Sequence, residues 1–324
     1  MWDLRRRAER ARREFERKTA PIRFWSDARR FAWRAARDTE IPLRAGPAPG
    51  HLGRTTHFFH FLFDVLLPLS HLLEAHPGAR VSYPVEDVGL FGSILTGLYG
   101  ERVRIVEAVP TGALPIAGWN PMVHPRSARE WADFRRHIFE RTSVRPPERF
   151  VDVVLINRPK RAESGETAGE GTGPRSIPNY AELSGALRRS VPNHAELARV
   201  LGSMIRLPYR LVDAALETMP FEEQVRLFAG AAGVIGQHGA GLGHIVWMPS
   251  TSIAAEIGFR NRDHFALISR QVGVGHFLYD PARGRHAELD VAAFCDWLES
   301  ETPFGRFFQS GKPRADGARS CLGP

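Results

Sequence analysis

The chain has 324 residues, of which 43% are hydrophobic and 25% are charged, as in an ordinary globular protein. This length allows two domains or one large one, and the composition excludes a disordered chain, a collagen-like repeat and a disulfide scaffold. The formal net charge of +8 belongs to one end. Residues 1–38 hold 13 Arg and Lys against 6 Asp and Glu, whereas the other 286 residues hold 31 against 30. We therefore expect no nucleic-acid partner, because the body of the chain is almost neutral.

The two cysteines, Cys295 and Cys321, are too few for a disulfide framework, and their spacing matches no zinc motif. The most apolar run, residues 58–69, is interrupted by two polar residues and a proline, so we expect no membrane span. The first residues lack the apolar core of a signal peptide. These features predict a cytoplasmic protein.

Residues 1–43 predict a basic helical extension. Its two helices are expected at Asp3–Lys18 and Ser26–Asp38, on either side of a segment that contains Pro21. Aromatic residues alternate with arginines in this region. Two interpretations remain open: an interfacial anchor on anionic lipid, or helices that pack their aromatic side chains on the domain.

Residues 44–145 predict an N-terminal Rossmann-like domain, because short strand-like runs alternate there with helix-like runs. The expected strands are Ala79–Tyr83 and Val103–Glu107, and the expected helices are Phe58–His76, Val88–Tyr99 and Ser127–Arg141. A proline pair at residues 146–147 then predicts a linker.

Residues 146–310 repeat this alternation and predict a C-terminal Rossmann-like domain. Strands are expected at Val151–Ile156, Tyr209–Asp213, Gly233–Gln237 and Ser252–Ile257. Helices are expected at Asn179–Arg189, Ala195–Ile205, Phe221–Ala229, Leu242–Trp247 and Arg262–Val272. Residues 162–174 are interpreted as a lid or a surface insertion, and residues 311–324 as a disordered tail. The predicted fold is α/β, with two Rossmann-like domains facing a central cleft.

A glycine-rich turn, Gly239-Ala240-Gly241, follows one of the expected strands and precedes a helix that starts near Leu242. Glycines let the backbone approach a ligand closely, and a helix N-terminus favours a phosphate. The pattern differs from the dinucleotide fingerprint and from the kinase-type phosphate loop. His238 stands just before the turn, at the sheet edge where open α/β folds bind ligands.

Charged residues stand at two other expected strands. Glu256 lies in an otherwise apolar strand, either as an edge residue in solvent or as an acceptor for sugar hydroxyls. Arg158, Lys160 and Arg161 follow the strand 151–156. Such a cluster either neutralises a diphosphate or forms a solvated surface.

In the helix expected at residues 58–76, a regular period would put His57, His60, Asp64 and His71 on one face. An aspartate one turn after a histidine can orient the imidazole as a general base. The alternative is a structural His–Asp pair. A metal would need a further ligand from elsewhere, and we expect none.

Taken together, these motifs resemble glycosyltransferase family 61. The segment 219–242, followed by Met248-Pro249 and residues 254–257, is similar to that family's signature. Residues 58–66 resemble its other marker, an aromatic helix with a histidine and an acidic residue. The strand that ends in Asn157-Arg158 resembles an Ile-Ser-Arg strand of the family. The resemblance indicates a bacterial member of the capsular-polysaccharide type.

The resemblance implies a GT-B-like fold and an inverting, metal-independent hexosyl- or pentosyltransferase that needs no cofactor. The donor would be a nucleotide sugar, expected to be UDP-linked. The acceptor would be a cell-envelope polysaccharide, a related glycan or a lipid-linked saccharide at the inner membrane face. The implied donor residues are Arg158 on the diphosphate, with Arg161 beside it, Glu256 on the ribose, and His238, Gly239, Ala240, Gly241 and Leu242 at the phosphates. The implied catalytic residues are His60 and Asp64, with His57 and His71 on the acceptor side.

The chain departs from the family pattern at four places. His57 stands where Asn is usual, and Phe61 where Trp is common. An expected arginine is missing near Pro68, and Gly243 replaces a usual Thr or Ser. The departures in the first half motivate an alternative: a catalytically inactive glycan- or nucleotide-binding protein of the same fold that assists polysaccharide assembly.

Overall fold

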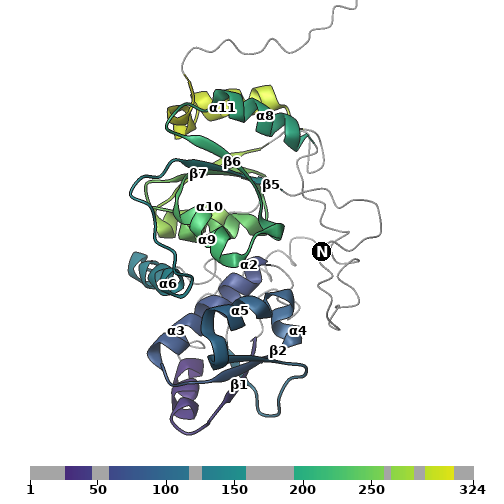
Figure 1. Cartoon of the computed structure of the whole chain (residues 1–324), viewed down its shortest axis with the longest axis vertical. Helices are drawn as coiled ribbons and strands as arrows, with labels where there is room; N and C mark the ends of the chain where they lie inside the picture. Colours follow the sequence, from purple (N-terminus) through teal and green to yellow (C-terminus); the bar gives the residue numbers. More distant parts are fainter. Residues whose placement is uncertain are drawn as a thin grey trace, which may run out of the picture.

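The computed structural model describes residues 26–45, 58–116, 126–157, 193–258, 264–280 and 289–309. These residues form two parallel β-sheets with helices between and around them, one sheet in each half of Figure 1. The predicted α/β class is thereby confirmed. Four predictions lie outside the described residues: the helices 3–18 and 179–189, the loop 162–174 and the tail 311–324.

The first sheet has the strand order β3-β2-β1-β4, and all of its neighbouring strands are parallel. β1 lies inside this sheet although no strand was predicted there, because its Pro42 and Arg44 interrupt the apolar pattern. The predicted domain boundary after residue 43 falls within β1. The strands are β1 (Ile41–Ala45), β2 (Val81–Pro84), β3 (Val103–Val106) and β4 (Leu114–Ile116).

A continuous helical run from Phe58 to Ala75 packs against this sheet. It consists of α2 (Phe58–His60), the π-helix η1 (Phe61–Leu66) and α3 (Leu67–Ala75). By length and composition this 18-residue run could cross a membrane, contrary to the sequence prediction, yet 72% of it is buried inside the chain. In this structure it is a core helix.

Two further helical segments of the first half are shaped by particular residues, one by a glycine that breaks it and one by a capping box at its start. The single helix predicted at residues 88–99 is broken near Gly89, whose φ of 52° is a conformation that favours glycine. α6 (Ala128–Arg141) begins with a capping box between Ser127 and Glu130, and its ends agree with the helix predicted at residues 127–141. The broken segment comprises α4 (Val85–Val88), η2 (Gly89–Phe91), α5 (Gly92–Tyr99) and η3 (Gly100–Arg102).

The second sheet has the strand order β6-β5-β7-β8-β9, again entirely parallel. The four strands predicted here are confirmed within two residues at each end, but β9 was missed. The strands are β5 (Asp152–Asn157), β6 (Arg210–Ala215), β7 (Ala231–Gln237), β8 (Ile253–Ile257) and β9 (Gly275–Tyr279).

Helices cover both faces of the second sheet. α8 (His194–Met204) and α11 (Val291–Ser300) lie on the face away from the first sheet (Figure 1). α9 (Phe221–Ala229) and α10 (His264–Val272) lie on the other face. The helix predicted at residues 242–247 is a 3-10 helix, η5 (Ala240–Trp247), and two more short 3-10 helices are η4 (Leu216–Thr218) and η6 (Pro303–Phe307).

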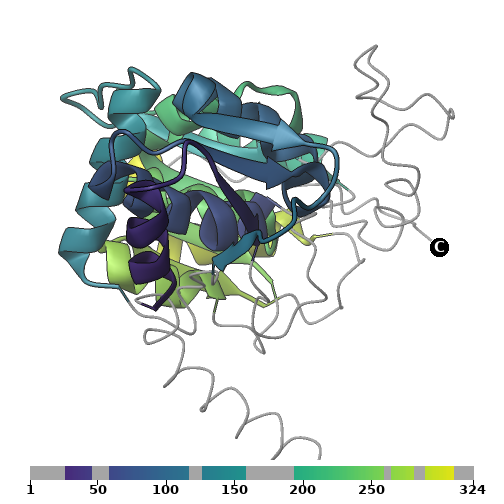
Figure 2. The same cartoon turned by 90° about the horizontal axis from the view of Figure 1, so that it is seen from below.

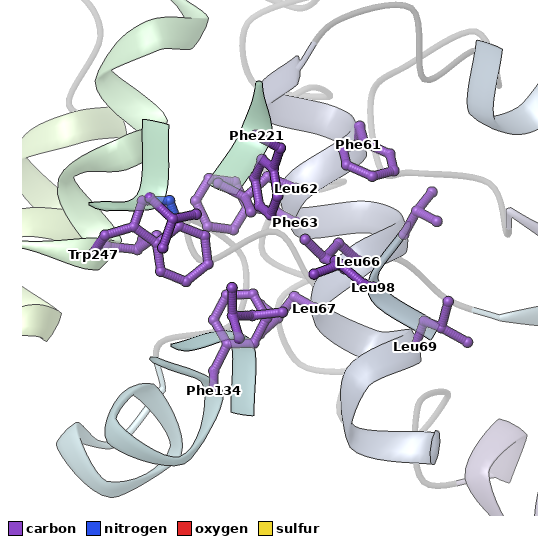
Figure 3. Packing of buried hydrophobic residues seen from close by; sticks show 14 of the residues in the cluster. Phe61, Leu62, Phe63, Leu66, Leu67, Leu69, Leu98, Phe134, Phe221 and Trp247 are labelled. Carbon is purple, nitrogen blue, oxygen red and sulfur yellow. The ribbon is translucent and has the colours of Figure 1, made fainter. Parts of the chain in front are cut away.

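The two sheets share one large hydrophobic core. Leu62, Phe63 and Leu67 of the central helical run meet Phe134 of α6 and Trp247 of η5 (Figure 3). Along this contact the described residues fill the space between the halves with apolar side chains. The central cleft remains a prediction.

α6 ties the first half to the second through hydrogen bonds. Nη1 of Arg135 donates to the carbonyl of Met248 at 3.0 Å, and Nη2 donates to that of Val272 at 3.1 Å. Burial lowers the pKa of Arg135, but the guanidinium stays charged at neutral pH. Charge-assisted bonds of this kind satisfy two main-chain carbonyls at once.

Arg135→Met is expected to lower the free energy of unfolding by about 1–3 kcal/mol, because two carbonyls lose their donor. Arg136→Met, one residue away, removes ion pairs to Glu74 and Asp133 from a half-exposed side chain. That control is expected to cost at most about 1 kcal/mol. Urea unfolding midpoints compare the two variants, and equal losses would contradict the assigned role of Arg135.

Candidate functional site

The site predicted for a phosphate ligand lies at the carboxyl edge of the second sheet. β5 and β7 are neighbours there, and the chain continues from β5 to β6 on one side and from β7 to β8 on the other. Open α/β sheets bind ligands at such a reversal of strand order, outside the carboxyl ends of the strands. β5 ends at Asn157, and β7 ends at Gln237, directly before His238.

Glycines allow the turn after β7 to touch the end of β5. A Cβ on Gly241 would lie 3.1 Å from Cδ1 of Leu216 and 3.3 Å from Cγ2 of Ile156. A Cβ on Gly236 would lie 3.0 Å from Cδ1 of Ile156. Gly239 has an extended backbone, and η5 starts at the next residue. The glycines therefore bring the start of η5 onto the end of β5.

His238 belongs to a buried hydrogen-bonded cluster with Glu256 and His276. Nδ1 of His238 bonds Oε1 of Glu256, and Nε2 of His276 lies 2.8 Å from Oε2 of the same carboxylate. The three residues come from consecutive positions in the sheet, at the end of β7, on β8 and on β9. The register of the three strands brings these side chains together. Glu256 is aligned with Gly236, two residues before His238, and His276 is aligned with Ala254, two residues before Glu256.

The cluster keeps Glu256 charged. Burial alone would raise the pKa of its carboxyl, but the hydrogen bonds from His238 and His276 outweigh burial and lower it. The carboxylate therefore accepts from both rings, and Nε2 of His238 is the nitrogen turned to other partners. Glu256 is 1% exposed and both its oxygens are engaged, which differs from the predicted contact with the donor's ribose.

The predicted His60–Asp64 pair forms at the start of the central helical run. Nδ1 of His60 lies 2.8 Å from Oδ2 of Asp64, which is 3% exposed. Asp64 lies within the π-helix, a distortion that occurs frequently at functional sites. Its other oxygen, Oδ1, is buried without a hydrogen-bond partner among the described residues.

His71 does not join that pair. Its Nε2 lies 2.6 Å from Nη1 of Arg126, and burial lowers its pKa to about 4. The π-helix explains the departure from the predicted stripe, because its hydrogen bonds span five residues and rotate every later side chain. His57, Arg158 and Arg161 lie outside the described residues.

Aromatic rings join the two polar sites. His264 and Phe265 at the start of α10 lie between them. Phe265 has its ring centroid 5.8 Å from that of Phe59 and 5.2 Å from that of His238. His264 lies 6.1 Å and 6.0 Å from the same two rings. Phe59, the neighbour of His60, and His238 thus contact the same two rings.

His276 is the site residue that the sequence interpretation missed. The strand–helix alternation ended with the helix predicted at residues 262–272, yet it calls for another strand, and His276 lies on that strand. In the described part of the chain, no group of three or more His, Cys, Asp and Glu is arranged to hold a metal ion. Metal independence remains a prediction.

These features describe an α/β protein with a strand-order reversal in its second sheet, where such folds bind ligands, and a histidine–carboxylate pair at the start of the central helical run. A family model described as glycosyltransferase 61 matches residues 58–254, from the start of α2 into β8. That match covers more than half of the chain and includes both His60–Asp64 and His238–Leu242. The chain belongs to glycosyltransferase family 61. A search of curated proteins returned no match.

His244 on η5 makes the free energy of unfolding depend on pH. Its ring is stacked between Phe58 and Phe228, with centroids 4.5 Å and 4.8 Å away, and its Nδ1 accepts from Trp247 at 3.1 Å. Burial lowers its pKa to about 3. The unfolded chain takes up this proton near pH 6.5. Between these values the unfolded state binds more protons, so the free energy of unfolding falls as the pH falls.

His244→Phe keeps a ring in the stack and removes the titrating group. Wild type is expected to lose on the order of 3 kcal/mol more than this variant between pH 7 and pH 4. At pH 7 the variant is expected to be less stable by about 1 kcal/mol, because Trp247 loses its acceptor. Urea unfolding across this range measures both effects. Parallel stability curves would contradict a buried neutral His244.

Proposed function

We propose that this glycosyltransferase moves a sugar from a nucleotide sugar to a hydroxyl of a cell-envelope polysaccharide or related glycan, with inversion. One observation carries the proposal: the two family motifs, at residues 58–66 and 219–242, come together at η5. Phe58 of the first motif stacks on His244, next to the glycine turn of the second. A donor at the turn and an acceptor near His60 would then be neighbours.

The donor diphosphate is assigned to the reversal between β5 and β7. The first N–H groups of η5 are suited to bind phosphate oxygens. Nε2 of His238, held by Glu256, would add a hydrogen bond to the same group. Arg158 and Arg161 follow β5 and would supply positive charge where the diphosphate leaves. Glu256 then acts through His238 rather than on the ribose.

The acceptor side is assigned to His60. Oδ2 of Asp64 accepts a hydrogen bond from Nδ1–H and so favours the tautomer in which Nε2 is the basic nitrogen, to which we assign the proton of an acceptor hydroxyl. The hydroxyl oxygen forms a bond to the anomeric carbon while the bond from that carbon to the diphosphate oxygen breaks. The diphosphate takes the electron pair. In-line displacement inverts the anomeric configuration.

The finer parts of the proposal follow the family resemblance. The two parallel sheets support a GT-B-like arrangement of two Rossmann-like domains, with the donor on the second. We propose a UDP-linked hexose or pentose donor, no metal and no cofactor. We also propose a bacterial role in capsule or exopolysaccharide assembly, in the cytoplasm at the inner membrane face. A lipid-linked saccharide acceptor would suit that location.

The alternative is a binding protein of the same fold without turnover. The first-half departures motivate it, and the departure at Gly243 adds no support, since a Cβ there would meet Leu62, Phe59 and Phe63 at 3.5–3.9 Å. That residue therefore faces the central helical run, away from the glycine turn. The retained His60–Asp64 hydrogen bond favours an active enzyme.

The test is transfer or hydrolysis with a panel of nucleotide sugars in the presence of a chelator. His60→Gln is expected to lower kcat at least about 100-fold with nucleotide binding unchanged, because it removes the base. His71→Gln is the matched control on the same helix, since His71 bonds Arg126 instead. It is expected to keep kcat within about threefold.

Three outcomes would reject parts of the proposed function or support the alternative. Equal activity of wild type and His60→Gln would reject His60 as the base. Nucleotide binding without turnover by the wild type on any acceptor would support the binding protein. Activity that requires a metal after chelation would reject the metal-independent mechanism.

A further inference from the structure

The helix formed by residues 26–35 presents an arginine-rich face away from the core. We call this surface the arginine–tryptophan face; it consists of Arg29, Arg30, Trp33 and Arg34 of the helix and Arg37 of the turn that follows it. Trp33 is 59% exposed, unusually high for so large an apolar side chain. The helix, dark purple, lies at the near side of the first half when the chain is viewed from below (Figure 2).

The opposite side of this helix is anchored in the first half. Phe31 is fully buried, and its ring centroid lies 5.6 Å from that of His76. Arg34 donates from Nε to Asp38 at 2.6 Å and from Nη1 to the carbonyl of Gly112 at 2.9 Å. The arginine–tryptophan face is therefore held in a fixed position on the surface of the protein.

A shallow cavity of about 300 Å³ opens on this face. It is lined by Arg29, Arg30, Trp33 and Arg34 of the helix and by Leu114 of β4. Guanidinium groups around a cavity floored by leucine and by the arginine stems fit a phosphate joined to an apolar group. A phospholipid headgroup with its first methylenes has this chemistry.

The charges around the cavity favour an extended anionic partner. The two acidic residues of the helix region, Asp27 and Asp38, are already paired with Arg30 and Arg34. Residues 1–25, which precede the helix in sequence, add nine Arg and Lys against four Asp and Glu. Several cations together bind a charged surface better than a single small anion.

The surroundings of Trp33 favour a membrane over an acidic glycan as the partner of this face. The guanidinium of Arg37 lies over the Trp33 ring, 4.1 Å from its centroid, and so covers one face on which a sugar could stack. An indole with an exposed edge among arginines is typical of the membrane–water interface.

We propose that the arginine–tryptophan face binds the surface of a membrane rich in anionic phospholipids. The arginines contact lipid phosphates, and Trp33 enters the interfacial layer. This proposal stands independently of glycosyl transfer, because none of its residues lies at the motifs of the site.

The test is co-sedimentation of the full chain with vesicles of phosphatidylcholine alone and with one quarter phosphatidylglycerol. The wild type is expected to bind only the anionic vesicles, less strongly at high salt. Arg29→Glu with Arg37→Glu changes the charge without breaking the pairs to Asp27 and Asp38. This double variant is expected to weaken binding at least tenfold, because each cation near the surface contributes about 1 kcal/mol.

Trp33→Ala is expected to weaken binding several-fold at any salt concentration. The matched control is Arg199→Glu with Arg270→Glu, which makes the same charge change at exposed positions on α8 and α10. The control is expected to bind within about twofold of wild type. Circular dichroism and urea midpoints confirm that all variants fold.

Three results would overturn the proposal. One is equal binding of anionic vesicles by wild type and the Arg29–Arg37 double variant, which would show that residues outside the arginine–tryptophan face bind the vesicles. Another is an equal loss in the control pair, which would indicate net charge alone. The third is binding to a soluble acidic polysaccharide without binding to anionic vesicles.

Discussion

The stack of Phe58, His244 and Phe228 is the contact on which the rest of the structure depends. Its rings lie 4.5 Å and 4.8 Å apart, and they come from the central helical run, from η5 and from α9. A charged imidazole would not tolerate this burial, so the stack requires a neutral His244. Together with the shared apolar core and the hydrogen bonds of Arg135, the stack holds the first half on the second and so helps to set how far His60 lies from His238.

Most of the fold was predictable because parallel sheets repeat one simple pattern. Buried strands such as β5 and β7 are short apolar runs, and α6 and α9 have clear starts. The missed strands are short or of mixed character: β1 contains Pro42 and Arg44, β4 is only three residues long, and β9 is only half buried along its length. The π-helix was not predictable, because nothing in the sequence pattern distinguishes η1 from a helix of regular period.

The candidate site was predictable where partners are close in sequence and not where they meet across strands. His60 and Asp64 are four residues apart, so helical spacing alone suggested their pairing. Glu256 meets residues 18 and 20 positions away, and only the register of three strands decides which they are. The sequence interpretation assigned Glu256 to the donor's ribose without its hydrogen bond to His276, because β9 was not predicted. The ribose contact itself stays a prediction.

The burial of the central helical run has a consequence for how the chain is made. Ala75 ends the run, and η5, which covers its first turns, begins 165 residues later. At synthesis rates of about 5–20 residues per second, roughly 10 to 30 seconds separate the two on the ribosome. During that interval an apolar 18-residue helix lacks its native cover. The nascent chain is therefore expected to need a chaperone more than the finished protein does.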